Sequence, residues 1–177
     1  MNLETAILKN LIYNEEYLRK VLPFIKVEYF SNFSDSLVFG EIISFVEKYN
    51  SPPSLEAIKL AIKENKQTTD EILNSAEKQL DEIEKNKNEV SKMEWLIDKT
   101  EKFCQEKAIY NAVLSSISIL DGKDKTHDKG TIPKLLQDAL GVSFDSSVGH
   151  DYLENSDDRY EFYHRKEERI PFDLEYF

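Results

Sequence analysis

Residues 91–120 form the longest helical pattern in the chain, and this pattern limits the folds that the chain can adopt. A helix of about thirty residues spans roughly 45 Å, whereas a globule of about 100 residues has a radius of gyration of only about 13 Å. We therefore expect this helix to project beyond the domain that precedes it. Its apolar residues form a narrow face in the first half, at Trp95, Leu96 and Phe103, but lie on several sides over residues 108–120.

A polar loop and a second, shorter helix follow this pattern. Residues 121–130 turn the chain, and Pro133 stands in the first turn of a helix that ends near Leu140. The two helices are predicted to form a helical hairpin. A return helix of about ten residues covers only one side of its apolar partner, so we expect a second copy of the chain to cover the other side. The predicted subunit interface consists of Ile109, Val113, Leu114, Ile117, Leu120, Leu135, Leu136 and Leu140.

The first ninety or so residues also show helical periodicity and clear helix boundaries. Pro23 ends the second helix, and Asn50-Ser51-Pro52-Pro53 ends the third. Thr68 and Ser91 precede Glu71 and Glu94 by three residues, which is the spacing of a capping box. Helix starts are predicted at Asn2, Asn14, Ser34, Ser54, Thr68 and Ser91.

No segment shows the alternation of a β-strand, so we predict an all-α fold. We divide the chain into three parts. Residues 1–90 are predicted to form a compact helical domain, residues 91–140 the projecting hairpin, and residues 141–177 a linker with a docking helix.

The C-terminal segment combines a polar spacer with a helix-like aromatic stripe. Residues 143–149 contain Ser and Gly, and an aromatic segment follows them. Such a stripe typically marks an interaction site, and we expect it to dock onto a neighbouring molecule or domain. The alternative is that it packs back onto its own domain. The predicted docking residues are Tyr152, Leu153, Tyr160, Tyr163, Ile170 and Phe172.

Charge and composition exclude several classes of protein. The chain contains 23 Lys and Arg against 34 Asp and Glu, a net charge of −11, so we expect little direct nucleic-acid binding. Cys104 is the only cysteine, which rules out an internal disulfide and favours a reducing compartment. No apolar run approaches the roughly 20 residues that cross a bilayer, and no basic leader precedes the first apolar residues. We expect a cytoplasmic protein without membrane association.

The sequence contains no recognisable catalytic constellation. Its five glycines never take the spacing of a phosphate-binding loop. His127, His150 and His164 do not form a metal-binding set with Cys104, which we predict to be a small buried hydrophobic residue. We therefore predict no catalytic, cofactor-binding or metal-ligating residue in these 177 residues.

Five segments together resemble a known family. They are LETAILKNLIYNEEYLRKVLPFIKVEYF (3–30), SPPSLEAIK (51–59), WLIDKTEKFCQEKAIYNA (95–112), IPKLLQDALGVSFDS (132–146) and SFDSSVGHDYLENSDDRYEFYHRKEERIPF (143–172). In this order they resemble the N-terminal domain and interdomain linker of the replicative DNA helicases of T-even-type bacteriophages, which are relatives of the DnaB hexameric helicases. Residues 64–90 and 121–130 match poorly.

The resemblance implies a role in DNA replication. The parent protein would be a ring-shaped, ATP-driven 5′-to-3′ helicase in the host cytoplasm, with its motor, ATP and magnesium in a region following Phe177. The segment here would form the collar. Its hairpins would pair subunits into dimers within a hexameric ring, the collar would engage primase, and the tail helix would grip the motor of the adjacent subunit.

Two other classes of function remain open from the residues alone. The first is a free-standing helical adaptor that binds a replicative helicase or a primase. The second is a small helical enzyme, which the missing catalytic constellation disfavours.

Overall fold

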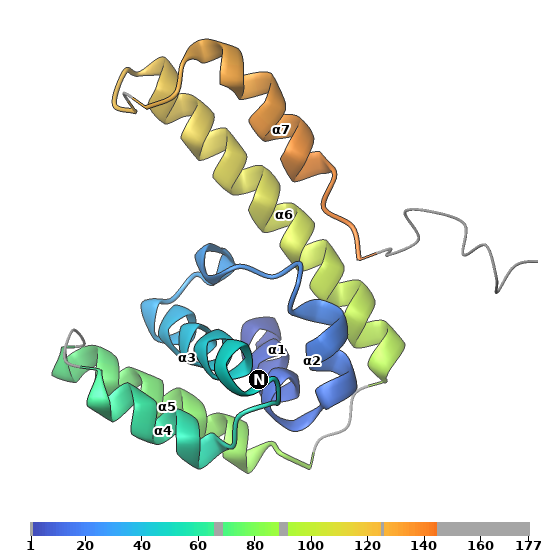
Figure 1. Cartoon of the computed structure of the whole chain (residues 1–177), viewed down its shortest axis with the longest axis vertical. Helices are drawn as coiled ribbons and strands as arrows, with labels where there is room; N and C mark the ends of the chain where they lie inside the picture. Colours follow the sequence, from blue (N-terminus) through green and yellow to red (C-terminus); the bar gives the residue numbers. More distant parts are fainter. Residues whose placement is uncertain (1, 66–68, 89–91, 125, 145–177) are drawn as a thin grey trace, which may run out of the picture. The chain divides into compact units, whose positions relative to one another are not determined.

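The computed structural model describes residues 2–65, 69–88, 92–124 and 126–144. These residues contain no β-strand, which confirms the predicted all-α fold (Figure 1). The elements in chain order are α1 (Leu3–Tyr13), α2 (Glu15–Val21), η1 (Val27–Tyr29), α3 (Phe33–Tyr49), α4 (Leu55–Glu64), α5 (Asp70–Lys85), α6 (Met93–Leu120), η2 (Lys129–Thr131) and α7 (Ile132–Leu140).

Three predicted capping residues begin their helices as expected. The side chains of Asn2, Asn14 and Ser54 each accept a hydrogen bond from the backbone N–H three residues later, at 2.7, 3.0 and 3.2 Å. Each bond satisfies one of the free N–H groups in a first helical turn. At the other end of α3, Asn50 has a φ of 51°, so the left-handed residue ends the helix before the two prolines. These boundaries are confirmed.

Three other helix starts differ from the predictions. Helix α3 begins at Phe33, just before the predicted Ser34. Helices α5 and α6 begin after Thr69 and Lys92, neither of which caps its helix with a side chain. The predicted caps Thr68 and Ser91 lie outside the described residues. Tertiary packing contributes to the start of α6, because its first residue, Met93, packs against the core.

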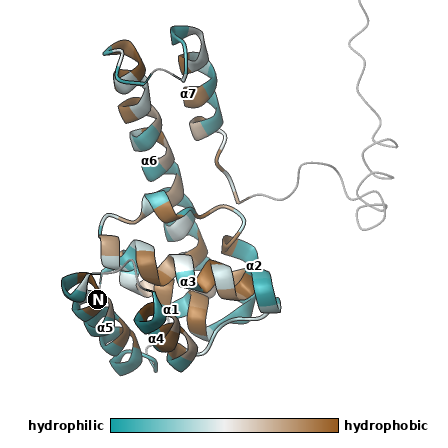
Figure 2. Ribbon diagram, turned by 60° about the vertical axis from the view of Figure 1, so that its left-hand side comes forward, coloured by the Kyte–Doolittle hydropathy of each residue, from teal (hydrophilic) through white to brown (hydrophobic). Residues whose placement is uncertain are grey.

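The helical body consists of α1–α5 with the first half of α6, and α1 lies at its centre. Helix α1 contacts α2, α3 and α5, and Ile7, Leu8 and Leu11 have no exposed surface. The first half of α6 completes this core through Leu96 and Phe103, both buried as predicted. Figure 2 shows hydrophobic and hydrophilic stretches along the whole of α6, beside the body and beyond it.

Trp95 corrects the predicted narrow face of α6. It was expected beside Leu96 and Phe103, but 51% of its surface is exposed and Lys99 Nζ lies 6.0 Å from its ring centroid. Consecutive helical residues are about 100° apart around the axis, so Trp95 and Leu96 point in different directions. Leu96 lies four residues before Thr100, which contacts Tyr17 of α2, so these two residues share the buried side of α6 and Trp95 stays in solvent.

The second half of α6 runs out of the body beside α7 (Figure 1). The 28 residues of α6 span about 42 Å at the rise of an α-helix. Helix α7 packs along α6, and Gly122, with a φ of 69°, lies in the turn that follows α6. This arrangement confirms the predicted projecting hairpin, which hereafter means the second half of α6 together with α7.

The chain divides into two units, residues 1–144 and residues 145–177. The predicted boundaries at residues 90 and 140 stay predictions. The predicted linker helix lies outside the described residues. Among the described helices, none combines the length and apolar character needed to cross a membrane.

Candidate functional site

The two helices of the hairpin meet along a seam of small residues. Ala108, Ala112 and Ser116 recur every four residues on α6, so they lie on one side of the helix, and all three are buried. Ala139 of α7 is buried in the same cluster as the two alanines. Ser116 Oγ donates to the carbonyl oxygen of Ala112 at 2.7 Å, which satisfies its hydroxyl within α6. Small side chains at a helix contact allow a close approach of the two axes.

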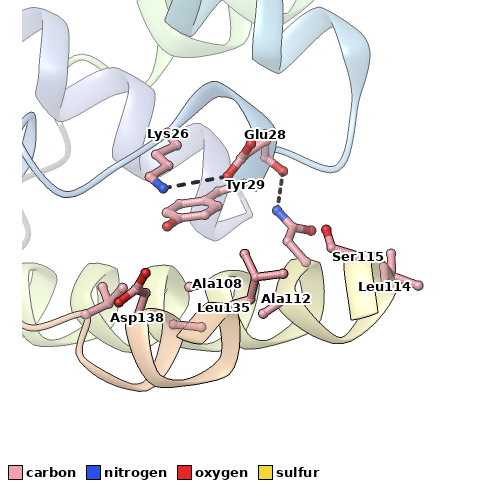
Figure 3. A pocket seen from close by; sticks show the side chains of 12 residues that line it. Lys26, Glu28, Tyr29, Ala108, Ala112, Leu114, Ser115, Leu135 and Asp138 are labelled. Carbon is pink, nitrogen blue, oxygen red and sulfur yellow. Dashed lines mark hydrogen bonds and ion pairs between the residues drawn. The ribbon is translucent and has the colours of Figure 1, made fainter. Parts of the chain in front are cut away.

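The Glu28-Tyr29-Phe30 triplet fixes the base of the hairpin to the body. The ring of Phe30 lies 6.1 Å from that of Phe103 on α6, measured between centroids. Asn111 Nδ2 donates to the carbonyl oxygen of Glu28 at 3.2 Å (Figure 3). These contacts attach η1 to α6 where the helix leaves the body, so they set the direction of the hairpin.

Helix α6 presents an apolar surface on the side away from the seam. The five predicted α6 interface residues are between 38% and 57% exposed, and Leu140 at the end of α7 is 72% exposed. We call this surface the hairpin face; it consists of Ile109, Val113, Leu114, Ile117 and Leu120, all on α6. Exposed apolar patches of this kind are typical of protein–protein contacts.

The remaining two predicted interface residues lie differently. Leu135 and Leu136 are half-buried within the hairpin, and Leu136 packs against the core. Their position follows from the short α7, which turns one side towards α6. The structure therefore brings five of the eight residues to one exposed side of α6, leaves Leu140 exposed on α7 and leaves two largely within the hairpin. Whether the region pairs with a second copy stays a prediction.

Tyr110 belongs to the same exposed surface but was not among the predicted interface residues. It is exposed and lies three and four residues before Val113 and Leu114. This helical spacing places all three on one side of α6. The spacing alone could have identified Tyr110, because the phenol carries a large apolar ring as well as its hydroxyl.

The segment after α7 returns along α6 and is held at several points. Gln105 Nε2 donates to the carbonyl oxygen of Val142 at 3.0 Å, and Glu101 Oε1 accepts from the backbone N–H of Phe144 at 3.0 Å. The ring of Phe144 stacks on that of Phe24 at a centroid distance of 4.8 Å. The predicted docking residues Tyr152, Leu153, Tyr160, Tyr163, Ile170 and Phe172 lie beyond this anchor, outside the described residues.

A cleft of about 500 Å3 separates η1 from the hairpin (Figure 3). Tyr29 and Leu135 line it from opposite sides, and Lys26 and Glu28 pair at 3.9 Å on the η1 side. Both charged side chains are largely exposed, so this pair contributes little to stability. The cleft presents mixed apolar and polar groups without a nucleophile paired with a base.

The two remaining residues that could take part in chemistry, Cys104 and Asp124, lie in surroundings typical of structural residues. Cys104 is fully buried as predicted, and burial raises the pKa of its thiol to about 12, so the reactive thiolate is scarce at neutral pH. In the turn after α6, Thr126 and His127 donate hydrogen bonds that hold the pKa of Asp124 well below its usual range. Within residues 2–65, 69–88, 92–124 and 126–144, no group of three or more His, Cys, Asp or Glu could hold a metal ion.

Comparison with known proteins relates this chain to a helicase. The chain is 34% identical over 176 residues to the DnaB-like replicative helicase of Enterobacteria phage T4. The match covers 95% of this chain but 36% of the helicase, so the chain spans about a third of that relative's length. No family model matches the chain. The similarity confirms the resemblance inferred from the sequence, is consistent with an N-terminal domain of such a helicase, and indicates a helicase-related region.

Proposed function

We propose that this segment is the N-terminal collar of a phage replicative 5′-to-3′ DNA helicase and that it assembles subunits through the hairpin face. The observation that carries the proposal is the exposure of apolar residues on the side of α6 that α7 leaves uncovered. The similarity to the T4 helicase supplies the context, because the matched region includes the whole hairpin sequence within 95% of the chain.

The energetics support pairing through this face. Full burial of one Leu or Ile side chain is worth about 1.5–3 kcal/mol, so a half-exposed residue gains about 1 kcal/mol when a partner covers it. Five such residues on each of two copies yield about 10 kcal/mol. The cost of association is estimated at about 4–15 kcal/mol, so the face supports dimers whose strength depends on the fit of the side chains.

The partial coverage of the relative supports a division of labour within the parent protein. The chain spans 36% of the T4 helicase, so we assign ATP and magnesium binding, and with them unwinding, to the part of the parent protein beyond this segment. The net charge of −11 supports little direct contact with DNA. The segment would therefore act by assembly, in dimers and in a hexameric ring, and by recruitment of primase. Tyr160, Tyr163 and the other predicted docking residues would contact the motor of the adjacent subunit.

Self-association tests the proposal directly. Sedimentation equilibrium of the purified chain should give a dimer mass, and Val113→Asp with Ile117→Asp should shift it to the monomer because two charges would be buried at the contact. A matched control carries Trp95→Asp and Phe33→Asp, which place two charges at exposed apolar residues elsewhere. The control should remain dimeric. A wild-type chain that stays monomeric at millimolar concentration would overturn the assembly role.

A further inference from the structure

A second apolar surface lies on the body, in a groove between α3 and α4. The groove has a volume of about 450 Å3. Its apolar lining consists of Phe45 and Tyr49 from α3 and Ala57, Ile58, Leu60 and Ala61 from α4. Helix α4 packs against α3 and α5, whereas the hairpin is formed by α6 and α7 (Figure 1). Pairing through the hairpin face would therefore leave this groove open.

The groove exposes large side chains that its own helices do not need for packing. Tyr49 is 54% exposed and Leu60 is 62% exposed. Leu60 lies off the buried stripe of α4, which consists of Leu55, Ile58 and Ile62. The ring centroids of Tyr49 and Phe45 lie 4.5 Å apart, so the two residues form an aromatic pair that lines the groove.

One end of the groove is acidic. Glu41 and Glu64 line it together, and the amide of Asn65, which follows Glu64, donates to Glu41 at 3.4 Å. Among the described residues, no Lys or Arg lies within ion-pair distance of Glu41 or Glu64. Lys48, the one cation among the described residues of the lining, has its ammonium 5.1 Å from the Tyr49 ring.

The lysines of α4 face away from the groove and are already paired. Lys59 donates to Asp81 at 2.9 Å and to Glu84 at 3.1 Å, and Lys63 pairs with Glu77 at 3.1 Å. All three carboxylates belong to α5. The α4 cations therefore stabilise the contact with α5 and do not neutralise the two glutamates of the groove.

We propose that this groove binds an amphipathic helix of a partner protein, with the apolar face of the helix on Phe45, Tyr49 and Leu60 and with Lys or Arg residues opposite Glu41 and Glu64. An amphipathic helix in an apolar groove is a common mode of peptide recognition. The acidic end selects a basic partner, because a like charge at the contact costs affinity. A second copy of this chain, with a net charge of −11, is a poor match.

Fluorescence anisotropy with two designed peptides tests the proposal on the full chain. Both peptides are helices of about 18 residues with one leucine face, and they differ only in carrying Lys or Glu at the flanking positions. The basic peptide should bind at least about tenfold more tightly than the acidic one, a difference of about 1.4 kcal/mol. Added salt should reduce this preference.

Variants locate the binding to the groove. Glu64→Lys should weaken binding of the basic peptide at least about tenfold and strengthen binding of the acidic peptide. Its control, Glu16→Lys on α2, changes the net charge equally and should leave both affinities unchanged. Leu60→Ser should weaken binding of both peptides. The same change at Phe33, another exposed apolar residue, should leave binding of both peptides unchanged.

Several outcomes would overturn the proposal. These are equal affinity for the two peptides, no binding of either, or equal effects of Glu64→Lys and Glu16→Lys. A fourth is a decrease in the mass of the free chain caused by Leu60→Ser, since the groove would then hold a second copy. Hairpin assembly is tested separately through Val113 and Ile117, so the two proposals can fail independently.

Discussion

The hydroxyl of Tyr17 lies 2.6 Å from Oγ1 of Thr100, and both side chains are fully buried between α2 and α6. Thr100 Oγ1 donates its proton to the carbonyl oxygen of Leu96 at 2.7 Å. Tyr17 must therefore be the donor in the bond between the two hydroxyls. This bond ties α2 to the half of α6 that lies in the body and thus supports the base of the projecting hairpin.

The direction of this hydrogen bond predicts unequal effects of two substitutions. Tyr17→Phe removes a donor and should lower the free energy of unfolding by about 1 kcal/mol, whereas Thr100→Val leaves the Tyr17 hydroxyl buried without an acceptor and should cost about 1–3 kcal/mol. In the Thr100→Val variant, the further substitution Tyr17→Phe should then lower the free energy of unfolding only slightly more, or raise it again. Urea denaturation measures each value, with Tyr110→Phe at an exposed site as control. If the two single substitutions had equal effects and these effects were additive in the double variant, the result would contradict Tyr17 as the donor.

Stability should depend on pH through Asp35. Burial raises the pKa of its carboxyl to about 6, with the hydrogen bond from Asn32 opposing this shift and the nearby carboxylates of Glu4 and Glu82 adding to it. The folded state then holds the proton more tightly than the unfolded state. The stabilisation is complete below the ordinary pKa of an aspartate and is lost as pH rises through about 6.

Asp35→Asn should remove this part of the pH dependence. We expect the substitution to flatten the unfolding free energy between pH 4 and 7 and to raise it at pH 7 by about 1–2 kcal/mol, because no buried carboxylate must then ionise. Urea denaturation across this pH range provides the measurement. Asp98→Asn, at an exposed residue of α6, serves as control and should leave the slope in place. An unchanged slope for Asp35→Asn would show that other groups cause it.

Cys104 should react with thiol reagents only when the body opens. Its thiol is fully buried, and burial raises its pKa to about 12, so both access and thiolate are limiting. With 5,5′-dithiobis-(2-nitrobenzoic acid) at pH 8, we expect modification at least about a hundredfold slower than in urea. Ser75→Cys, at an exposed residue of α5, serves as control and should add one thiol that reacts at the rate of the unfolded chain. Rapid labelling of Cys104 in the folded chain would show that the first half of α6 separates easily.

The predicted docking residues can be tested in a full-length parent helicase. Tyr160→Ala with Tyr163→Ala should weaken the hexameric ring, because two aromatic rings would be lost from the contact with the adjacent motor. Native mass spectrometry should then detect dimers that persist through the hairpin face. Val113→Asp in the same protein should instead remove the dimers. A ring unaffected by loss of both tyrosines would exclude their docking role.

Much of the local structure could be predicted because its causes are local. A capping side chain such as Asn2, Asn14 or Ser54 satisfies an N–H only three residues away, and two prolines end a helix wherever the chain goes next. The helical periodicity of the apolar residues in 91–120 likewise determined a helix that is longer than the diameter of a small globular domain. The projecting hairpin followed from that length, since α7 is too short to cover every side.

Which side each residue faces was decided only by the tertiary structure. Trp95 and Leu96 are apolar neighbours in the sequence, yet Leu96 is buried and Trp95 lies in solvent. The acidic character of the groove depends on Lys59 and Lys63, which pair with carboxylates of α5 that lie more than ten positions away in the sequence. Periodicity gives the angle between two residues around one helix axis. The direction of that axis and the helix packed across it depend on contacts between distant segments, so burial and the charge of a surface emerge only in the folded chain.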